Sequence, residues 1–323
     1  METIPIIYIM GYGRSGSTVL DAVLGNHPRI FSTGELVNLP GAGWIQNQFC
    51  SCHQRVRECR LWSAVFDEWI ANNGGISVQA YHDIQHRLFR FRHWPRLLAQ
   101  LRQKSSMFLA YETATLALFR AIRRVSGRSI IVDSSKYATR ALALSHMRGI
   151  DLKLIHLVRD IRGVAWSLRK TYLKNEGAGL QCDFHSMPAW KTSLLWMLSN
   201  LEAHHVRQRL GAVNSRLIHY EDFVSEPETV LSSIGMMVET DFFDQARMIR
   251  SGASFSPEHL VAGNRLRMNK SLKLTLDSEW KAKLPDKDRL VCMLLGGWLQ
   301  FLLQHERSRK GLKIIEEVSG FTG

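Results

Sequence analysis

Residues 4–24, which read IPIIYIMGYGRSGSTVLDAVL, decide the fold of this chain. Residues 4–10 are an apolar, largely β-branched run of strand length, and over residues 18–24 the apolar side chains recur with helical spacing. A glycine-rich loop, residues 11–18, joins the two. In such a unit the loop N–H groups and the positive end of the helix dipole face the same point. We therefore expect residues 11–18 to bind a phosphate.

The loop departs from the ATPase pattern at one position. Gly11 and Gly16 have the spacing of the P-loop GxxxxGKS or GxxxxGKT, but Ser17 stands where that pattern has lysine, and the loop's cation is Arg14. Nucleotide triphosphatases and kinases need that lysine on the phosphates. The loop thus predicts phosphate binding without ordinary ATP chemistry, and the alternative is a turn whose glycines serve packing alone. The candidate anion ligands are Gly13, Arg14, Ser15, Gly16, Ser17 and Thr18.

Length and charge limit the class of protein. A chain of 323 residues can bury a large core, and we predict a single domain over residues 1–323. No stretch approaches the roughly twenty apolar residues of a membrane span and no signal peptide fits, so we expect a cytoplasmic protein without a transmembrane segment. The formal charge of +13 favours anionic partners. Because nucleic-acid-binding motifs are missing, we expect no nucleic acid, whereas an anionic cofactor, an acidic acceptor or peripheral membrane contact all fit.

The cysteines do not indicate a disulfide framework, because they are five in number and no secretory signal precedes them. Cys50, Cys52, His53 and Cys59 crowd into ten residues. A zinc knuckle normally shows CxxC spacing and a second pair. The sequence leaves open whether this group binds metal, pairs or is merely structural, and we expect no metal in the reaction.

Strands and helices alternate along the rest of the chain. This alternation predicts a P-loop-type, three-layer α/β fold with a central parallel sheet of four or five strands and right-handed crossovers. Besides residues 4–10, the predicted strands are residues 29–33, 129–133, 152–158 and 216–219.

Residues 40–127 interrupt the alternation. They are rich in tryptophan and show helical spacing over residues 78–102 and 108–124, so we predict a mainly helical insertion that caps the acceptor side. Residues 251–274 are predicted to be a functional loop, and residues 290–303 a buried helix.

Polar side chains follow three of the strands. Glu35 comes after the second strand, Lys136 stands at the head of a helix predicted to reach residue 146, and Arg159 ends the strand over residues 152–158. Ser167 lies on the helix predicted for residues 161–171. Ligands of α/β sheets collect at the carboxyl edge, so we expect these residues to converge there.

Two motifs carry a resemblance to a known family. GYGRSGST, residues 11–18, resembles the 5′-phosphosulfate loop of sulfotransferases that use 3′-phosphoadenosine 5′-phosphosulfate (PAPS). LVRDIRGVAWS, residues 157–167, resembles their 3′-phosphate element, which implies that Arg159 and Ser167 bind the 3′-phosphate. The two motifs stand in the family's order and on the expected elements.

Weaker similarities cover more of the chain. GEL, residues 34–36, is similar to the tyrosylprotein and bacterial carbohydrate members, which implies that Glu35 is the base. Residues 218–231 resemble the segment whose tyrosine, here Tyr220, lies against the nucleotide. Residues 270–285 resemble the stretch that closes over the cofactor, which makes Asn264, Arg265 and Lys270 candidate lid contacts.

The chemistry of sulfuryl transfer suits these residues. Negative charge must be stabilised on the bridging and sulfuryl oxygens, which Arg14 and the loop N–H groups can do without a metal. The acceptor hydroxyl needs a base, for which we favour Glu35, with His27, His219 or His259 as alternatives. Lys136 stabilises the leaving nucleotide or the developing charge, or merely closes a helix N-terminus.

The predicted reaction transfers a sulfuryl group from PAPS to a hydroxyl acceptor and releases 3′-phosphoadenosine 5′-phosphate (PAP). The alternatives are a P-loop phosphotransferase or nucleotide kinase, and a non-catalytic module that binds anionic ligands. A carbohydrate, a tyrosyl side chain and a small molecule all fit as acceptors, because acceptor choice resides in insertions and loops. The oligomeric state is left open.

Overall fold

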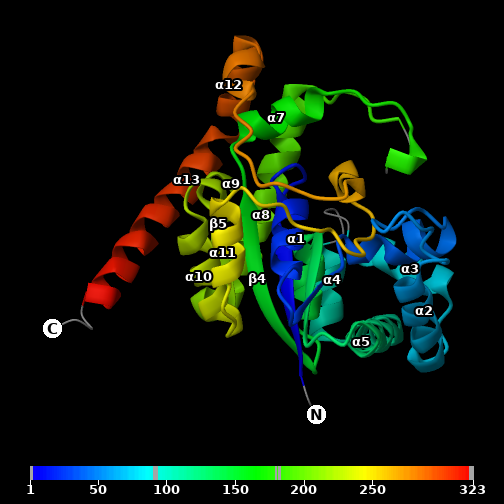
Figure 1. Cartoon of the computed structure of the whole chain (residues 1–323). Coiled ribbons are helices and arrows are strands. Elements are labelled where there is room, and N and C mark those ends of the chain that lie inside the picture. The colour runs from blue at the N-terminus through cyan, green and yellow to red at the C-terminus, as the bar shows by residue number, and fades with distance from the viewer. Residues whose placement is uncertain (1–2, 90–93, 179, 181–182, 320–323) are drawn as a thin grey trace.

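The structure is a computed structural model that describes residues 3–89, 94–178, 180 and 183–319. Within these residues a wholly parallel sheet lies at the centre, with strand order β2-β3-β1-β4-β5 (Figure 1). The arrangement confirms the predicted fold class and gives the sheet five strands. The strands are β1 (Ile4–Met10), β2 (Ile30–Ser32), β3 (Ile130–Lys136), β4 (Ile150–Val158) and β5 (Ser215–His219).

Strand β1 shows why these residues form the centre of the sheet. Its side chains alternate between two hydrophobic clusters, with Ile6 and Tyr8 on one face and Ile7 and Ile9 on the other. All four side chains are fully buried. A strand buried on both faces needs a continuous apolar run, which is the pattern of residues 4–10.

Helices cover both faces of the sheet and form the outer layers (Figure 1). Helices α1, α10 and α11 share a core with Ile7 and Ile9, whereas α2, α3, α5 and α6 share one with Ile6 and Tyr8. The helices are α1 (Ser17–Gly25), α2 (Arg60–Asn72), α3 (Val78–Leu88), α4 (Trp94–Arg102), α5 (Ser106–Ser126), α6 (Ala138–Leu144), α7 (Ile161–Arg169), α8 (Ala189–Asn214), α9 (Tyr220–Ser225), α10 (Pro227–Val238), α11 (Phe243–Arg250), α12 (Trp280–Lys283) and α13 (Asp286–Ser319).

The insertion, residues 40–127, is mainly helical and packs into the same core as the sheet. Trp44, Trp62 and Trp69 are buried there with Ile6 of β1. The helical spacing over residues 78–102 corresponds to two helices, since α3 ends at Leu88 and α4 starts at Trp94. Proline, here the second residue of α4, has no N–H to donate and is tolerated in a first turn.

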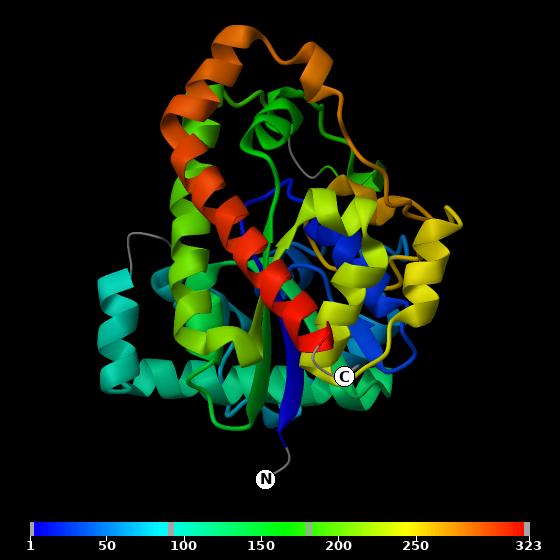
Figure 2. The same cartoon turned by 90° about the vertical axis from the view of Figure 1, so that its left-hand side faces the viewer.

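Two predictions need correction. Residues 134–136 belong to β3, and the helix that follows is confined to α6, because Lys136 ends the strand in the left-handed region with φ 72°. Helix α13 is longer than residues 290–303 and buries one side alone: Cys292 and Leu299 are buried, whereas Leu290 and Leu294 are exposed. Figure 2 shows α13 running obliquely beside α8, against which it packs.

The segment over residues 251–274 is largely without regular structure, as expected for a loop. A short 3₁₀ turn spans Arg265–Met268, and Val261 makes a parallel bridge with Gly34. This bridge places the loop beside the end of β2. Among the described residues, no helix combines the length and apolar character needed to cross a bilayer.

Candidate active site

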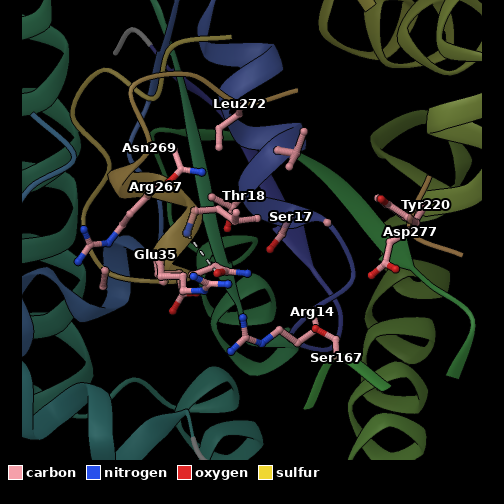
Figure 3. A pocket seen from close by; sticks show the side chains of 18 of the residues that line it. Arg14, Ser17, Thr18, Glu35, Ser167, Tyr220, Arg267, Asn269, Leu272 and Asp277 are labelled. Atoms are coloured by element: carbon pink, nitrogen blue, oxygen red, sulfur yellow. Dashed lines mark hydrogen bonds between the residues drawn. The ribbon is translucent and has the colours of Figure 1, made fainter. Parts of the chain in front are cut away.

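A cavity of about 630 Å³ opens at the carboxyl edge of the sheet, which is large enough for a nucleotide-sized ligand. The loop after β1 and the ends of β3 and β4 form one part of its wall (Figure 3). Residues 262–277 form another, and they belong to a segment over residues 259–277 that is called the lid segment below. The predicted site residues that line it are Gly13, Arg14, Gly16, Ser17, Thr18, Glu35, Lys136, Arg159, Ser167, Tyr220, Asn264 and Arg265.

Two predicted residues lie elsewhere. Ser15, within the loop, is buried at 1% exposure and does not line the cavity. Lys270 is exposed on the surface of the lid segment. None of His27, His219 and His259 lines the cavity, nor does any other histidine in the part of the chain that the structure describes.

The phosphate loop has the conformation that its glycines permit. Gly16 has φ 92°, and a Cβ atom there would lie 2.5 Å from the ring of Tyr220. Helix α1 begins at the next residue, so its unpaired N–H groups face the cavity. Arg14 also adopts a left-handed conformation, and its guanidinium lies over the ring of Phe184, 4.9 Å from the centroid. Burial lowers the pKa of Arg14.

Glu35 and Lys136 form a direct ion pair inside the cavity, with Lys136 Nζ on Glu35 Oε1. Asn38 Nδ2 donates to the other carboxylate oxygen at 2.9 Å. The Glu35 backbone N–H donates to Val261 O at 3.0 Å, which ties the residue to the lid segment. Both side chains of the pair remain about one-fifth exposed, so a ligand can reach them.

Arg159 occupies another part of the cavity wall. Its guanidinium donates to Asp277 Oδ2 at 2.9 Å and to the Arg14 carbonyl at 3.1 Å, and it lies over the ring of Tyr220. The Tyr220 hydroxyl donates to Thr275 O at 2.6 Å. Burial raises the pKa of Tyr220.

Two other carboxylates that could pair with Arg159, Asp133 of β3 and the adjacent Asp160, are engaged elsewhere. Asp133 forms a fully buried pair with Arg140 at 3.0 Å, and Asp160 pairs with Arg162 at 2.6 Å. Arg159 therefore keeps a donor face toward the cavity, where Asp277 is its carboxylate partner.

The lid segment contributes two predicted residues, Asn264 and Arg265, and two that the sequence did not single out, Arg267 and Asp277. Asn264 Oδ1 accepts from Leu266 N at 3.2 Å and so begins the 3₁₀ turn, while Arg265 lies over Tyr172. Asp277 and the buried Arg267 also line the cavity. Arg267 lies within the expected functional loop, but no spacing or motif marks it.

Comparisons with known proteins give one family match and several similar solved structures. The sequence profile of a family described as the sulfotransferase family matches residues 5–244. The structure is similar to the sulfotransferase domain of the Synechococcus PCC 7002 olefin synthase, with 22% identity over 93% of this chain and 95% of that one and a TM-score of 0.49. The sulfotransferase domain from the curacin biosynthetic pathway has 19% identity over 91% of this chain and 98% of that one, with a TM-score of 0.47. A sulfotransferase from Alicyclobacillus acidocaldarius has 13% identity over 90% of this chain and 95% of that one, with a TM-score of 0.37. Comparison with curated proteins gives no match.

Proposed function

This chain belongs to the sulfotransferase family, and from that premise we propose that it transfers a sulfuryl group from PAPS to a hydroxyl acceptor and releases PAP. The observation that carries the proposal is the pair of cations in one cavity, Arg14 in the phosphate loop and Arg159 at the end of β4. Two separated cations suit a ligand with two separated anionic groups, as PAPS has at its 5′ and 3′ positions.

Binding of the cofactor would use the loop and the β4 end together. The N–H groups that begin α1, with Ser17 and Thr18, would hold the 5′-phosphosulfate. Arg159 and Ser167 would hold the 3′-phosphate, and the ring of Tyr220 supports the Arg159 guanidinium from the other side. A 3′-phosphate would compete with Asp277 for the same donors.

Glu35 is the proposed base. It would take the proton of the acceptor hydroxyl as the acceptor oxygen forms a bond to sulfur. The bond from sulfur to the bridging oxygen breaks, and its electron pair stays on the 5′-phosphate of PAP. The lack of a histidine lining the cavity, within the described ranges, favours Glu35 over the alternatives.

Lys136 has two successive partners in this proposal. Without cofactor it pairs with Glu35, and both side chains face the cavity. A bound phosphosulfate would draw the ammonium toward the bridging oxygen, where negative charge develops, and would leave the carboxylate free to accept a proton. No metal takes part in these steps.

The acceptor is proposed to be a hydroxyl of a carbohydrate, a tyrosyl side chain or a small molecule. Arg265 and Arg267 line the cavity from the lid segment, and burial lowers the pKa of Arg267. These cations support an acceptor that itself carries negative charge, in keeping with the net charge of +13.

Calorimetric titration tests the proposal. It compares the binding of PAP, with and without Mg²⁺, with the binding of ATP and of adenosine 5′-phosphosulfate. We expect tight, metal-independent binding that needs the 3′-phosphate and is lost in Arg159→Ala. Arg169→Ala is the matched control, because Arg169 lies on α7 in an exposed pair with Asp288. Stronger binding of ATP with Mg²⁺ would favour a kinase, and PAP binding without transfer to any acceptor would favour a binding module.

A further inference from the structure

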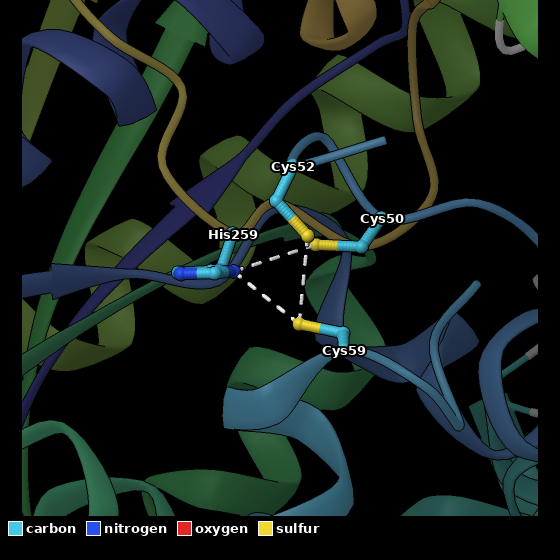
Figure 4. Close-up of side chains that lie close together, drawn as sticks. All are labelled: Cys50, Cys52, Cys59 and His259. Carbon is cyan, nitrogen blue, oxygen red and sulfur yellow. Dashed lines mark hydrogen bonds between the residues drawn. The ribbon is translucent and has the colours of Figure 1, made fainter. Parts of the chain in front are cut away.

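Three cysteines and a histidine outside the cavity meet at one point (Figure 4). The thiols of Cys50, Cys52 and Cys59 face Nδ1 of His259, and the four ligand atoms lie within 4.8 Å of one another. Cys50 and Cys59 are fully buried, and the other two residues are partly buried. His53, which the sequence groups with the cysteines, is exposed and does not belong to the cluster.

From this cluster we propose a structural zinc site in which Cys50, Cys52, Cys59 and His259 are the four ligands. The soft thiolates and the imidazole are the donors that zinc prefers, and four protein ligands make a closed, structural site rather than a catalytic one. The proposal does not depend on sulfuryl transfer.

The distances agree with tetrahedral coordination. Two sulfurs bound at about 2.3 Å to a tetrahedral zinc lie about 3.8 Å apart, and a sulfur and an imidazole nitrogen about 3.6 Å apart. Cys52 Sγ and Cys59 Sγ are 3.6 Å apart. His259 Nδ1 is 3.3 Å from Cys59 Sγ and 3.7 Å from Cys50 Sγ. A disulfide would need an S–S length of about 2.05 Å, which is much shorter than the distance between Cys52 Sγ and Cys59 Sγ.

The backbone around the cysteines presents the thiols in one direction. A tight turn holds Cys50 and Cys52, since Cys50 N donates to Gln54 O at 2.9 Å and His53 N donates to Cys50 O at 3.0 Å. Cys59 is the N-cap of α2, where the helix dipole favours a thiolate. The turn thus presents Cys50 and Cys52, and the start of α2 presents Cys59. These three thiols can enclose an ion without movement of the backbone.

The fourth ligand connects the insertion to the lid segment. Trp62 Nε1 donates to His259 O at 2.8 Å, and Ser51 Oγ accepts from Leu260 N at 2.7 Å. The next residue, Val261, makes the backbone bonds to Thr33 and Glu35. A zinc ion here would therefore fix the lid segment two residues away from the point where it supports Glu35.

Metal analysis of the full-length protein, purified without chelator, tests the site. We expect one zinc per chain, and cobalt in its place should give the d–d and thiolate charge-transfer bands of a tetrahedral site. His259→Gln should lose the metal, whereas His259→Cys should keep it with stronger thiolate charge transfer. Two control variants should retain it: His53→Asn, which keeps a residue tolerant of φ 66°, and Cys292→Ala, which removes a distant buried thiol.

Three results would overturn the proposal. They are a wild-type protein that takes up neither zinc nor cobalt after reduction, equal metal content in His259→Gln and wild type, and a mass lower by two hydrogen atoms with Cys52 joined to Cys59. If His259→Gln does not fold, the cobalt spectra of wild type and His259→Cys still decide the question. Failure here leaves the proposed reaction untouched, since none of these measurements uses PAPS or an acceptor.

Discussion

The guanidinium of Arg159 lies over the ring of Tyr220, with its central carbon 4.8 Å from the ring centroid, and the same guanidinium binds Asp277. Arg159 is therefore held on one side by an aromatic face and on the other by a carboxylate. Such a side chain has lost most of its rotational freedom before a ligand arrives, which lowers the entropic cost of binding.

The ring of Tyr220, rather than its hydroxyl, is expected to hold Arg159. Tyr220→Phe keeps the ring and loses the 2.6 Å bond to Thr275 O, so PAP affinity should fall about threefold or less. Tyr220→Leu removes the aromatic face, and affinity should fall about tenfold. Calorimetry on both variants measures the difference. Equal losses would mean that the hydroxyl, by fixing the lid, matters as much as the ring.

Asp277 competes with an incoming phosphate for Arg159. Asp277→Asn removes a negative charge next to the proposed 3′-phosphate site. PAP should therefore bind several-fold more tightly, which corresponds to about 1 kcal/mol of binding free energy. Asp286→Asn removes the same charge from a fully exposed position on α13 and should leave affinity unchanged. Weaker binding in Asp277→Asn would instead make this carboxylate a positioning group for Arg159.

Replacement of Glu35 should reduce turnover and leave cofactor binding intact. Glu35→Gln keeps the shape and can still accept from Asn38, but it cannot take a proton, so kcat should fall about 10²–10⁴-fold. PAP affinity measured by calorimetry should change little. Glu58→Gln, an exposed change in the insertion, is the control. Unchanged kcat in Glu35→Gln would transfer the role of base to another group.

Gly263 sets the position of the Glu35 carboxylate. A Cβ atom at residue 263 would lie 2.9 Å from Glu35 Oε1, so Gly263→Ala should displace the carboxylate and reduce kcat about tenfold or more. Gly252→Ala is matched, because Gly252 also has positive φ but its Cβ would meet nothing within 4 Å. The control should cost about 1 kcal/mol of stability and no activity. Similar kcat values in the two variants would exclude a positioning role for Gly263.

Ionisation of the Asp21 carboxyl should lower the free energy of unfolding as the pH rises. Its carboxyl is fully buried on α1 and accepts from Ser32 and Ser134, the latter at 2.6 Å, and burial raises its pKa to about 7. In the unfolded chain the pKa is about 4, so between pH 4 and pH 7 the folded state holds the proton that the unfolded state has lost. The free energy of unfolding therefore falls by up to about 1.4 kcal/mol per pH unit over this window and is constant above it.

Denaturant unfolding of Asp21→Asn between pH 5 and pH 8 checks this slope. The variant should gain stability relative to wild type as the pH rises, because the neutral amide has no proton to lose. Asp67→Asn, an exposed change on α2, should show no such trend. Parallel curves for wild type and Asp21→Asn would place the pKa of Asp21 close to its unfolded value.

Local patterns were enough to predict the parallel sheet and most of the cavity wall. The apolar run of β1 and the polar residues after the strands, such as Glu35 and Arg159, follow from the alternation of strand and helix and from the shared carboxyl edge. The roles assigned to these residues stay predictions. The spacing over residues 78–102 does not by itself divide α3 from α4, although Pro95 in the first turn of α4 is typical of a helix start.

Contacts between distant segments could not be predicted. Asp277 is one acid in an irregular segment, and nothing in its surroundings indicates that it faces Arg159 across 118 positions of sequence. His259 lies 200 positions beyond Cys59, so the adjacent His53 was grouped with the cysteines in its place. The position of Ser15 could not be predicted either, although it lies within the loop. The conformation of the loop buries this hydroxyl, so that it does not line the cavity.

The central position of β1 has a consequence for synthesis of the chain. This strand is synthesised before the other four described strands, yet Ile6 pairs with Ile131 of β3 and with Leu152 of β4. At about 5–20 residues per second, roughly 7 to 30 seconds separate the appearance of β1 from that of β4. For most of that interval a strand with two apolar faces has no neighbouring strand to pair with, which leaves it exposed to non-specific association.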